Sequence, residues 1–146
     1  MIVVADTNVA LRIIGKDDDA QQTRAALKIA GEAERLVVPV MVLCEFCWVL
    51  RTEKPRKEVA AAIRCLLDLE NIVVDETAVR AGLRMLDAGG DFADGVIQHT
   101  GSQQAGVPSV FASFDRKAVR LLEEQGFSTL VPTDASPESE ENGESA

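Results

Sequence analysis

Two aspartates follow apolar segments of the kind that form buried strands, at the point where each segment ends. Asp6 comes directly after residues 2–5, and Asp115 follows residues 110–112. In a parallel sheet, the carboxyl ends of the strands meet at one edge, and ligands bind beyond that edge. We therefore expect these two carboxylates to lie at the same edge of a sheet.

Other carboxylates occur where a charged side chain is unexpected. Glu45 is the only charged residue in residues 36–50, on a predicted helix so apolar that little solvated face is expected. Asp91 and Asp94 follow a glycine pair at the start of another predicted helix, and residues three apart share a helix face. Glu45 and Asp94 therefore join the two strand-end acids as candidate site residues.

A group of ionised carboxylates requires compensation. A buried carboxylate without a partner costs several kcal/mol or more, so it pairs with a base, takes up a proton or binds a cation. The neighbouring sequence of Asp6 and Glu45 contains no arginine or lysine that could pair with them. Hard divalent cations such as Mg²⁺ and Mn²⁺ prefer oxygen ligands. The acids thus predict a site for one of these two metals.

Each acid also has an ordinary structural interpretation, which the sequence leaves open. Asp6 and Asp115 can cap the helices that follow them, and Glu45 can pair with a distant arginine. Asp91 and Asp94 can be first-turn acids that the helix dipole favours. The joint interpretation is stronger, because topology places the two strand-end acids at one edge.

Short apolar runs alternate with helical patterns along the chain, which indicates an α/β fold with a parallel sheet covered on both faces. Strands are expected at residues 2–5, 36–38, 72–74, 110–112 and 129–131. Helices are expected at residues 8–14, 20–34, 41–51, 55–69, 91–104 and 115–125, with one more capped by Thr77 and carrying Val79, Leu83 and Leu86. The segment 15–19 is a polar break, and the expected sheet has five strands.

The composition fits one globular domain. The chain has 146 residues, and no apolar run reaches the roughly 20 uncharged residues that a membrane span needs. The first residues lack the basic region of a signal peptide, and three cysteines suit reduced thiols in a cytoplasm. The net charge is −9, of which residues 133–146 contribute five acids, so the body carries −4. We expect residues 1–132 to form the domain and residues 133–146 to be a disordered acidic tail.

With these residues in place, the sequence resembles the PIN-domain nucleases, and among them the VapC-type toxins. Four blocks carry the resemblance in family-like order and spacing over about residues 1–132. They are Asp6-Thr7-Asn8, the run from Val42 to Leu50 around Glu45, Asp91-Phe92-Ala93-Asp94, and Ser113-Phe114-Asp115. One departure is Gly95, where the family more often has alanine, and we expect it to loosen the helix slightly.

The resemblance implies a three-layer fold and a Mg²⁺- or Mn²⁺-dependent endoribonuclease that a cognate VapB-type antitoxin inhibits. The family's acidic quartet corresponds to Asp6, Glu45, Asp94 and Asp115, and Asp6 and Asp94 are our first choices as direct metal ligands. Supporting positions are Thr7, Asn8, Asp91 and Ser113. The resemblance also implies a homodimer and an RNA substrate.

Two basic clusters could meet an RNA strand beside such an acidic site. One comprises Arg51, Lys54, Arg56 and Lys57, and the other comprises Arg116, Lys117 and Arg120. Of these, Arg116 and Lys117 are our candidates for RNA contact. Solvated helix ends explain the same charges equally well.

Other motifs predict competing functions. Cys44 and Cys47 have the spacing of a zinc or redox site, but they lie inside an apolar helix, so inert buried thiols are expected. His99 is expected to be a surface or packing residue. Trp48 and Phe46 are expected to be core or interface residues rather than base-stacking groups. A non-catalytic binding module remains open. A receiver-type signalling domain with an acidic metal-binding pocket fits poorly, since Asp75 is a weak phosphoacceptor candidate and no lysine follows the fifth strand. Asn8 excludes a phosphatase with an Asp-x-Asp pair.

Overall fold

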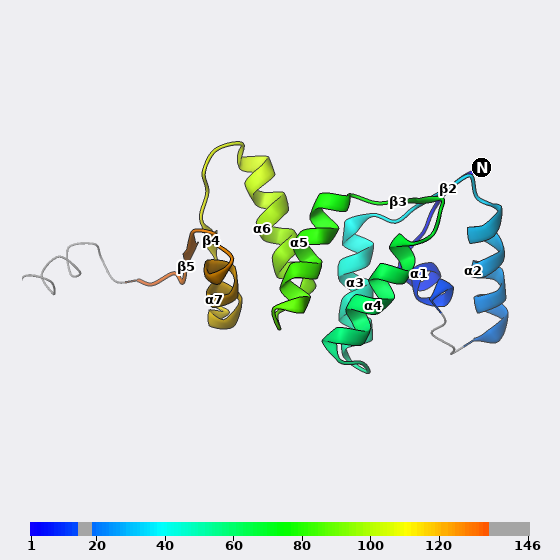
Figure 1. Cartoon of the computed structure of the whole chain (residues 1–146), viewed down its shortest axis with the longest axis horizontal. Helices are drawn as coiled ribbons and strands as arrows, with labels where there is room; N and C mark the ends of the chain where they lie inside the picture. The colour runs from blue at the N-terminus through cyan, green and yellow to red at the C-terminus, as the bar shows by residue number, and fades with distance from the viewer. Residues whose placement is uncertain (15–18, 135–146) are drawn as a thin grey trace, which may run out of the picture. The chain divides into compact units, whose positions relative to one another are not determined.

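The chain folds into two compact units. A computed structural model describes residues 1–14 and 19–134 (Figure 1). The first unit comprises Met1–Val107 and the second Pro108–Ala146. Residues 15–18 of the predicted polar break at residues 15–19, and residues 135–146 of the predicted acidic tail, lie outside the described residues.

The first unit contains a parallel sheet of three strands. They are β1 (Ile2–Val4), β2 (Arg35–Val37) and β3 (Ile72–Val73), in the order β1-β2-β3. Ile2 pairs with Arg35 in one ladder, and Leu36 pairs with Ile72 in the next. The Ala5 amide donates to the Val37 carbonyl at 2.9 Å, which continues the ladder to the residue before Asp6. The end of β1 is therefore fixed by pairing up to the first candidate acid.

The expected five-stranded sheet is wrong. In the second unit, β4 (Phe111–Ala112) pairs with β5 (Thr129–Leu130) as a separate parallel ladder. All five strands lie where the apolar runs predicted them, so the error concerns which strands pair. An apolar run marks a strand, but burial and turn geometry select its partner and register. Helix α7 (Arg116–Glu124) supplies the crossover that a parallel pair requires.

Six helices of the first unit lie close to their predicted positions. They are α1 (Thr7–Ile13), α2 (Ala20–Glu32), α3 (Val40–Arg51), α4 (Arg56–Leu67), α5 (Glu76–Asp87) and α6 (Phe92–Ala105). One cap differs from the expectation. Asp75, and not Thr77, caps α5, because its carboxylate accepts from the Ala78 amide at 3.3 Å. Thr77 instead donates its hydroxyl to Asp75 at 3.1 Å. No helix among the described residues is long and apolar enough to cross a membrane.

The core of the first unit combines side chains of the sheet, of one side of α3 and of the helices packed against α3. Leu36 of β2 and the α3 residues Phe46 and Leu50 are fully buried there. The other side of α3 faces solvent and carries Glu45 and Trp48. The expectation that α3 lacks a solvated face is therefore wrong, because only one side of this very apolar helix is covered. Glu45 reaches water as a result.

Helices α5 and α6 pack side by side at unusually close range (Figure 1). A Cβ atom added at Gly82 would collide with the Phe92 ring, and one at Gly95 would collide with the Ala81 carbonyl oxygen. The same Cβ at Gly95 would lie 2.8 Å from Cγ of Met85. Gly95 therefore permits the close contact that holds the first turn of α6. The prediction that Gly95 loosens the helix slightly did not anticipate this packing role.

We predict that Gly95→Ala destabilises the protein although alanine is the better helix former. The helix-propensity gain is about 1 kcal/mol. Overpacking against a backbone carbonyl costs about 1–3 kcal/mol, and this contact lies at the upper end, so the net loss should be about 1–2 kcal/mol. Urea unfolding monitored by circular dichroism measures it.

Gly101→Ala is the matched control, because it lies in the same helix with nothing within 4 Å of an added Cβ. This variant should gain about 0.4–1 kcal/mol. Equal gains for the two variants would show that Gly95 has no packing role.

Candidate metal centre

Two of the predicted site residues of the first unit, Asp91 and Asp94, lie close together at the start of α6. Asp91 is the N-cap of α6, and Asp94 lies in its first turn. Each offers a carboxylate oxygen within 4.8 Å of the other. Asp91 is exposed and Asp94 is half-buried. The prediction that these two residues share a helix face is confirmed.

Asp91 differs from the other aspartate N-caps in how its carboxylate is used. Asp6 and Asp19 each accept a hydrogen bond from an amide of the helix that they cap, whereas Asp91 makes no such side-chain bond. The Asp91 carboxylate faces Arg56 instead, with 4.0 Å between Oδ1 and Nη2. Asp91 is thus held away from its own helix amides and beside the Asp94 carboxylate.

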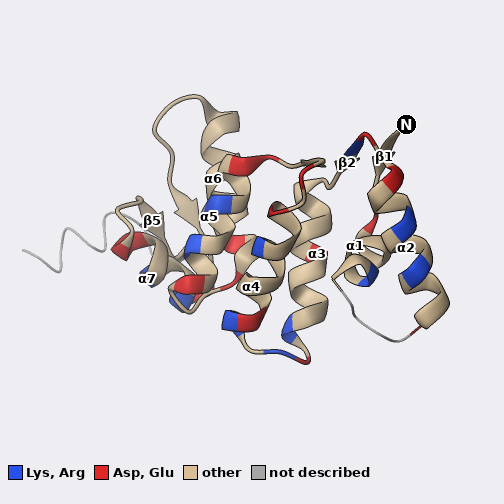
Figure 2. Cartoon of the chain, turned by 45° about the vertical axis from the view of Figure 1, so that its right-hand side comes forward, with Lys and Arg blue, Asp and Glu red and all other residues tan. Residues whose placement is uncertain are grey.

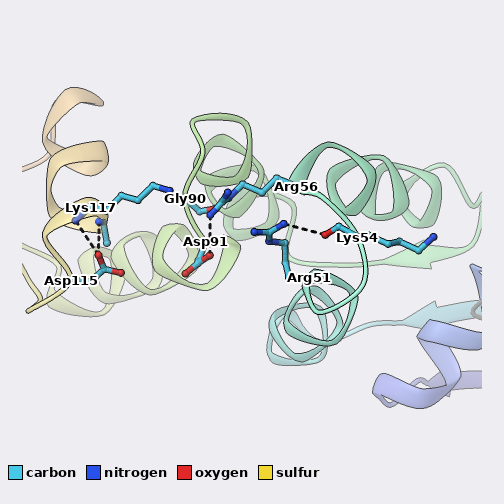
Figure 3. A network of polar contacts seen from close by, with 8 residues as sticks. Arg51, Lys54, Arg56, Gly90, Asp91, Asp115 and Lys117 are labelled. Atoms are coloured by element: carbon cyan, nitrogen blue, oxygen red, sulfur yellow. Dashed lines mark hydrogen bonds and ion pairs between the residues drawn. The ribbon is translucent and has the colours of Figure 1, made fainter.

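Arg56 fixes the turn before α6. Its Nε donates to the Gly90 carbonyl at 2.9 Å, and Figure 3 shows the guanidinium between Gly90 and Asp91. Sequence reasoning assigned Arg56 only to a basic cluster and missed this contact. No local pattern could have placed Arg56 beside a glycine 34 positions away.

The chemistry of this pair fits a hard divalent cation. Two ionised carboxylates this close repel each other, and positive charge nearby offsets that repulsion. The positive end of the α6 dipole and Arg56 supply part of that charge. Mg²⁺ is commonly held by one or two carboxylates while it keeps several waters. Asp91 and Asp94 are therefore able to hold Mg²⁺ or Mn²⁺.

A pocket of about 350 Å³ lies between α3 and the start of α6. Cys44, Trp48 and Arg51 line it from α3, and Asp91 and Asp94 line it from α6. Asp91 and Asp94 thus line a pocket with room for part of a ligand.

The residues around the end of β1 form a second group. Thr7 donates its hydroxyl to Oε2 of Glu45 at 2.9 Å, which joins α1 to α3. The adjacent Asp6 accepts from the Val9 amide at 3.0 Å through Oδ1. Asn8 lies with Asp6 along another hollow of about 400 Å³. Within this unit, the Asp91–Asp94 cluster includes neither Asp6 nor Glu45.

Asp115 caps α7 in the second unit. Its Oδ1 accepts from the Lys117 amide at 3.0 Å and from the Ala118 amide at 3.2 Å (Figure 3). The Asp115 amide donates to Oγ of Ser113 at 3.0 Å. Both bonds that the Asp115 carboxylate accepts use Oδ1, and a carboxylate that caps with one oxygen has a second oxygen for other ligands. Arg116 and Lys117 are exposed beside it.

The expectation that these acids are costly buried charges is wrong. Asp6, Glu45, Asp91 and Asp115 are exposed, and the described part of the chain contains no buried charged side chain. Each acid lies at an element end or on an open helix face, where water reaches it. The proximity of Asp91 and Asp94, and not desolvation, therefore favours a bound cation at this site.

The remaining candidates behave as packing residues. Burial raises the pKa of the Cys44 and Cys47 thiols, so neither is a ready thiolate ligand. His99 contacts Thr77, with 3.1 Å between Nε2 and Oγ1. Cys47 is buried as expected, whereas Cys44 is only half-buried, and His99 is half-buried on α6. Trp48, however, is not in the core, because its side chain is exposed.

Comparison with known proteins supports the family assignment that the motifs suggested. The family model described as the PIN domain matches residues 3–124, most of the chain. No curated protein matches the chain.

We predict that Mn²⁺ stabilises the protein against heat through the carboxylates at the start of α6. A ligand that binds only the folded state adds about 2.7 kcal/mol when its concentration is 100 times the dissociation constant. Asp94→Asn should lose most of this gain. Asp68→Asn, at the exposed end of α4, is the matched control and should keep it. Thermal scans with and without Mn²⁺ measure the difference, and an equal response of both variants would contradict a site at Asp94.

Proposed function

This chain belongs to the PIN domain family, and on that basis we propose that it is a Mg²⁺- or Mn²⁺-dependent endoribonuclease. PIN domains are generally metal-dependent nucleases, and PIN nucleases act on RNA. The observation that carries the proposal is the pair of carboxylates within 4.8 Å at the start of α6, which has the chemistry of a divalent-metal site.

We propose Asp6, Glu45, Asp94 and Asp115 as the catalytic acids, with Asp6 and Asp94 as the first choices for direct metal ligands. The position of Asp91 beside Asp94 supports a place for Asp91 in the same site. For Asp115 the support is its motif with Ser113, since in its own unit it acts as a helix cap.

A bound divalent ion lowers the pKa of a coordinated water and stabilises charge on a phosphodiester. The side chains of this chain position the reacting groups. Thr7 holds the Glu45 carboxylate through its hydroxyl, which fixes the direction in which Glu45 can accept a proton. Asn8 can donate its amide to a phosphate oxygen. Arg116 and Lys117 are exposed and cationic, which suits contact with RNA phosphates.

We further propose that the protein is the toxin of a type II toxin–antitoxin pair, with a VapB-type antitoxin as its partner and a homodimer as its assembly. The support is the resemblance of the four motifs to VapC-type toxins. A receiver-like function has less support, because Asp75 serves as the cap of α5.

We predict that Asp94→Asn lowers the rate of RNA cleavage by about 10²–10³-fold, because losing a charge-stabilising group in an active site typically costs this much. Asp6→Asn should have a similar effect. The measurement is cleavage of total RNA with Mg²⁺ or Mn²⁺, and EDTA should abolish it.

Asp87→Asn is the control, since Asp87 pairs with Arg64 on the surface, 2.9 Å apart, and should leave cleavage unchanged. Full activity in Asp94→Asn, or activity that EDTA does not affect, would refute the metal-dependent mechanism.

A further inference from the structure

The side chain of the only tryptophan in the chain is exposed to solvent. Trp48 is 77% exposed on the uncovered side of α3. Burying a large aromatic side chain contributes strongly to a core or an interface, so leaving it exposed forgoes that stabilisation. An exposed aromatic side chain that lines a pocket is available to a ligand with an apolar or aromatic face.

Trp48 lies in the immediate surroundings of the acidic pair. It lines the same pocket as Asp91 and Asp94, with Arg51 one helical turn further along the same face of α3. A ligand group that contacts the indole of Trp48 therefore lies in the pocket that Asp91 and Asp94 line.

Cations follow directly after this aromatic position. Residues 51–57 contain Arg51, Lys54, Arg56 and Lys57 against one acid, Glu53, with Glu58 next to them. Figure 2 shows basic residues at the end of α3, in the turn and at the start of α4. Arg51 donates to the Lys54 carbonyl at 3.1 Å and Arg56 to the Gly90 carbonyl, so the turn is held in place (Figure 3). Lys54 and Lys57 are exposed on it.

We propose that Trp48 stacks on an unpaired base of a single-stranded RNA whose phosphates lie along the cations of residues 51–57. This inference rests on the proposed ribonuclease function and adds Trp48 as a residue that positions the RNA. Single-strand binding surfaces combine a cationic track with aromatic side chains on which bases stack. A base in a duplex is already stacked on its neighbours and is unavailable to the indole, so a duplex should bind less well.

A second copy of the chain is the other occupant to consider. The centre of a subunit interface is depleted of charged residues. On the face of α3 that carries Trp48, Glu45 lies three residues before it and Arg51 three residues after it. This alternation of charge and aromatic matches a nucleic acid better than an apolar subunit interface.

The fluorescence of Trp48 can report RNA binding without an added label. The chain has one tryptophan and no tyrosine, so its tryptophan fluorescence reports Trp48 alone. Oligoadenylate and oligouridylate, titrated into the full chain in EDTA, should quench this fluorescence. Their duplex should quench it far less, and added salt should weaken the binding of the single strands.

Variants at Trp48 separate stacking from apolar contact. Trp48→Leu should weaken binding of oligoadenylate, measured by anisotropy of a labelled strand, by roughly 5- to 150-fold, because it removes one stacked base. Trp48→Phe keeps a ring and should recover most of the affinity. Leu27→Ala removes another exposed apolar side chain, on α2, and should bind like the original protein. In cleavage assays with metal, Trp48→Leu should raise KM and leave kcat nearly unchanged.

The outcomes distinguish this inference from the proposed function. Metal-dependent cleavage with no quenching, and equal affinity for Trp48→Leu, would overturn the stacking role and leave the ribonuclease intact. Quenching by single strands without any cleavage would keep the stacking surface and refute the ribonuclease. A Trp48 emission that changes with protein concentration and not with RNA would assign the face to a second copy and overturn the inference.

Discussion

The repulsion between two carboxylates at the start of α6 is the constraint on which this account depends. Asp91 and Asp94 each offer an oxygen within 4.8 Å of the other, and Arg56 stands 4.0 Å from the first of them. The dipole of α6 and the Arg56 guanidinium offset part of that repulsion. A divalent cation with oxygen preference offsets more of it, which is the basis of the proposed chemistry.

The fold holds this pair in place through close backbone packing. Gly82 on α5 and Gly95 on α6 let the two helices come so close that a Cβ atom added at either glycine would collide with the other helix. Arg56, at the start of α4, holds the turn before α6 by donating a hydrogen bond to the Gly90 carbonyl. The pocket wall opposite the acids comes from α3, whose other side is buried in the core. The acids, the pocket and Trp48 are thus positioned by helices that the core and the glycines hold.

Local sequence patterns predicted the helices and strands. The pairing of the strands and the contacts around the site depend on residues far apart in the chain. Apolar spacing located the strands and helices, and the three-residue spacing of Asp91 and Asp94 predicted that they share a face. The pairing of β4 with β5 depends on contacts between segments far apart in the chain, which no local pattern reveals. For the same reason, the bond from Arg56 to Gly90 and the exposure of Trp48 and Glu45 could not be predicted. Burial of the acids was inferred from apolar neighbours, but a helix covered on one side leaves its other side in water.

The most direct test of the central claim is anomalous diffraction from crystals of the protein grown with Mn²⁺. The account predicts a strong manganese peak bound to the Asp94 carboxylate, and its loss in Asp94→Asn crystals grown under the same conditions. Crystals in which Mn²⁺ binds elsewhere, or in which the Asp91 and Asp94 carboxylates remain without a metal at saturating Mn²⁺, would contradict it.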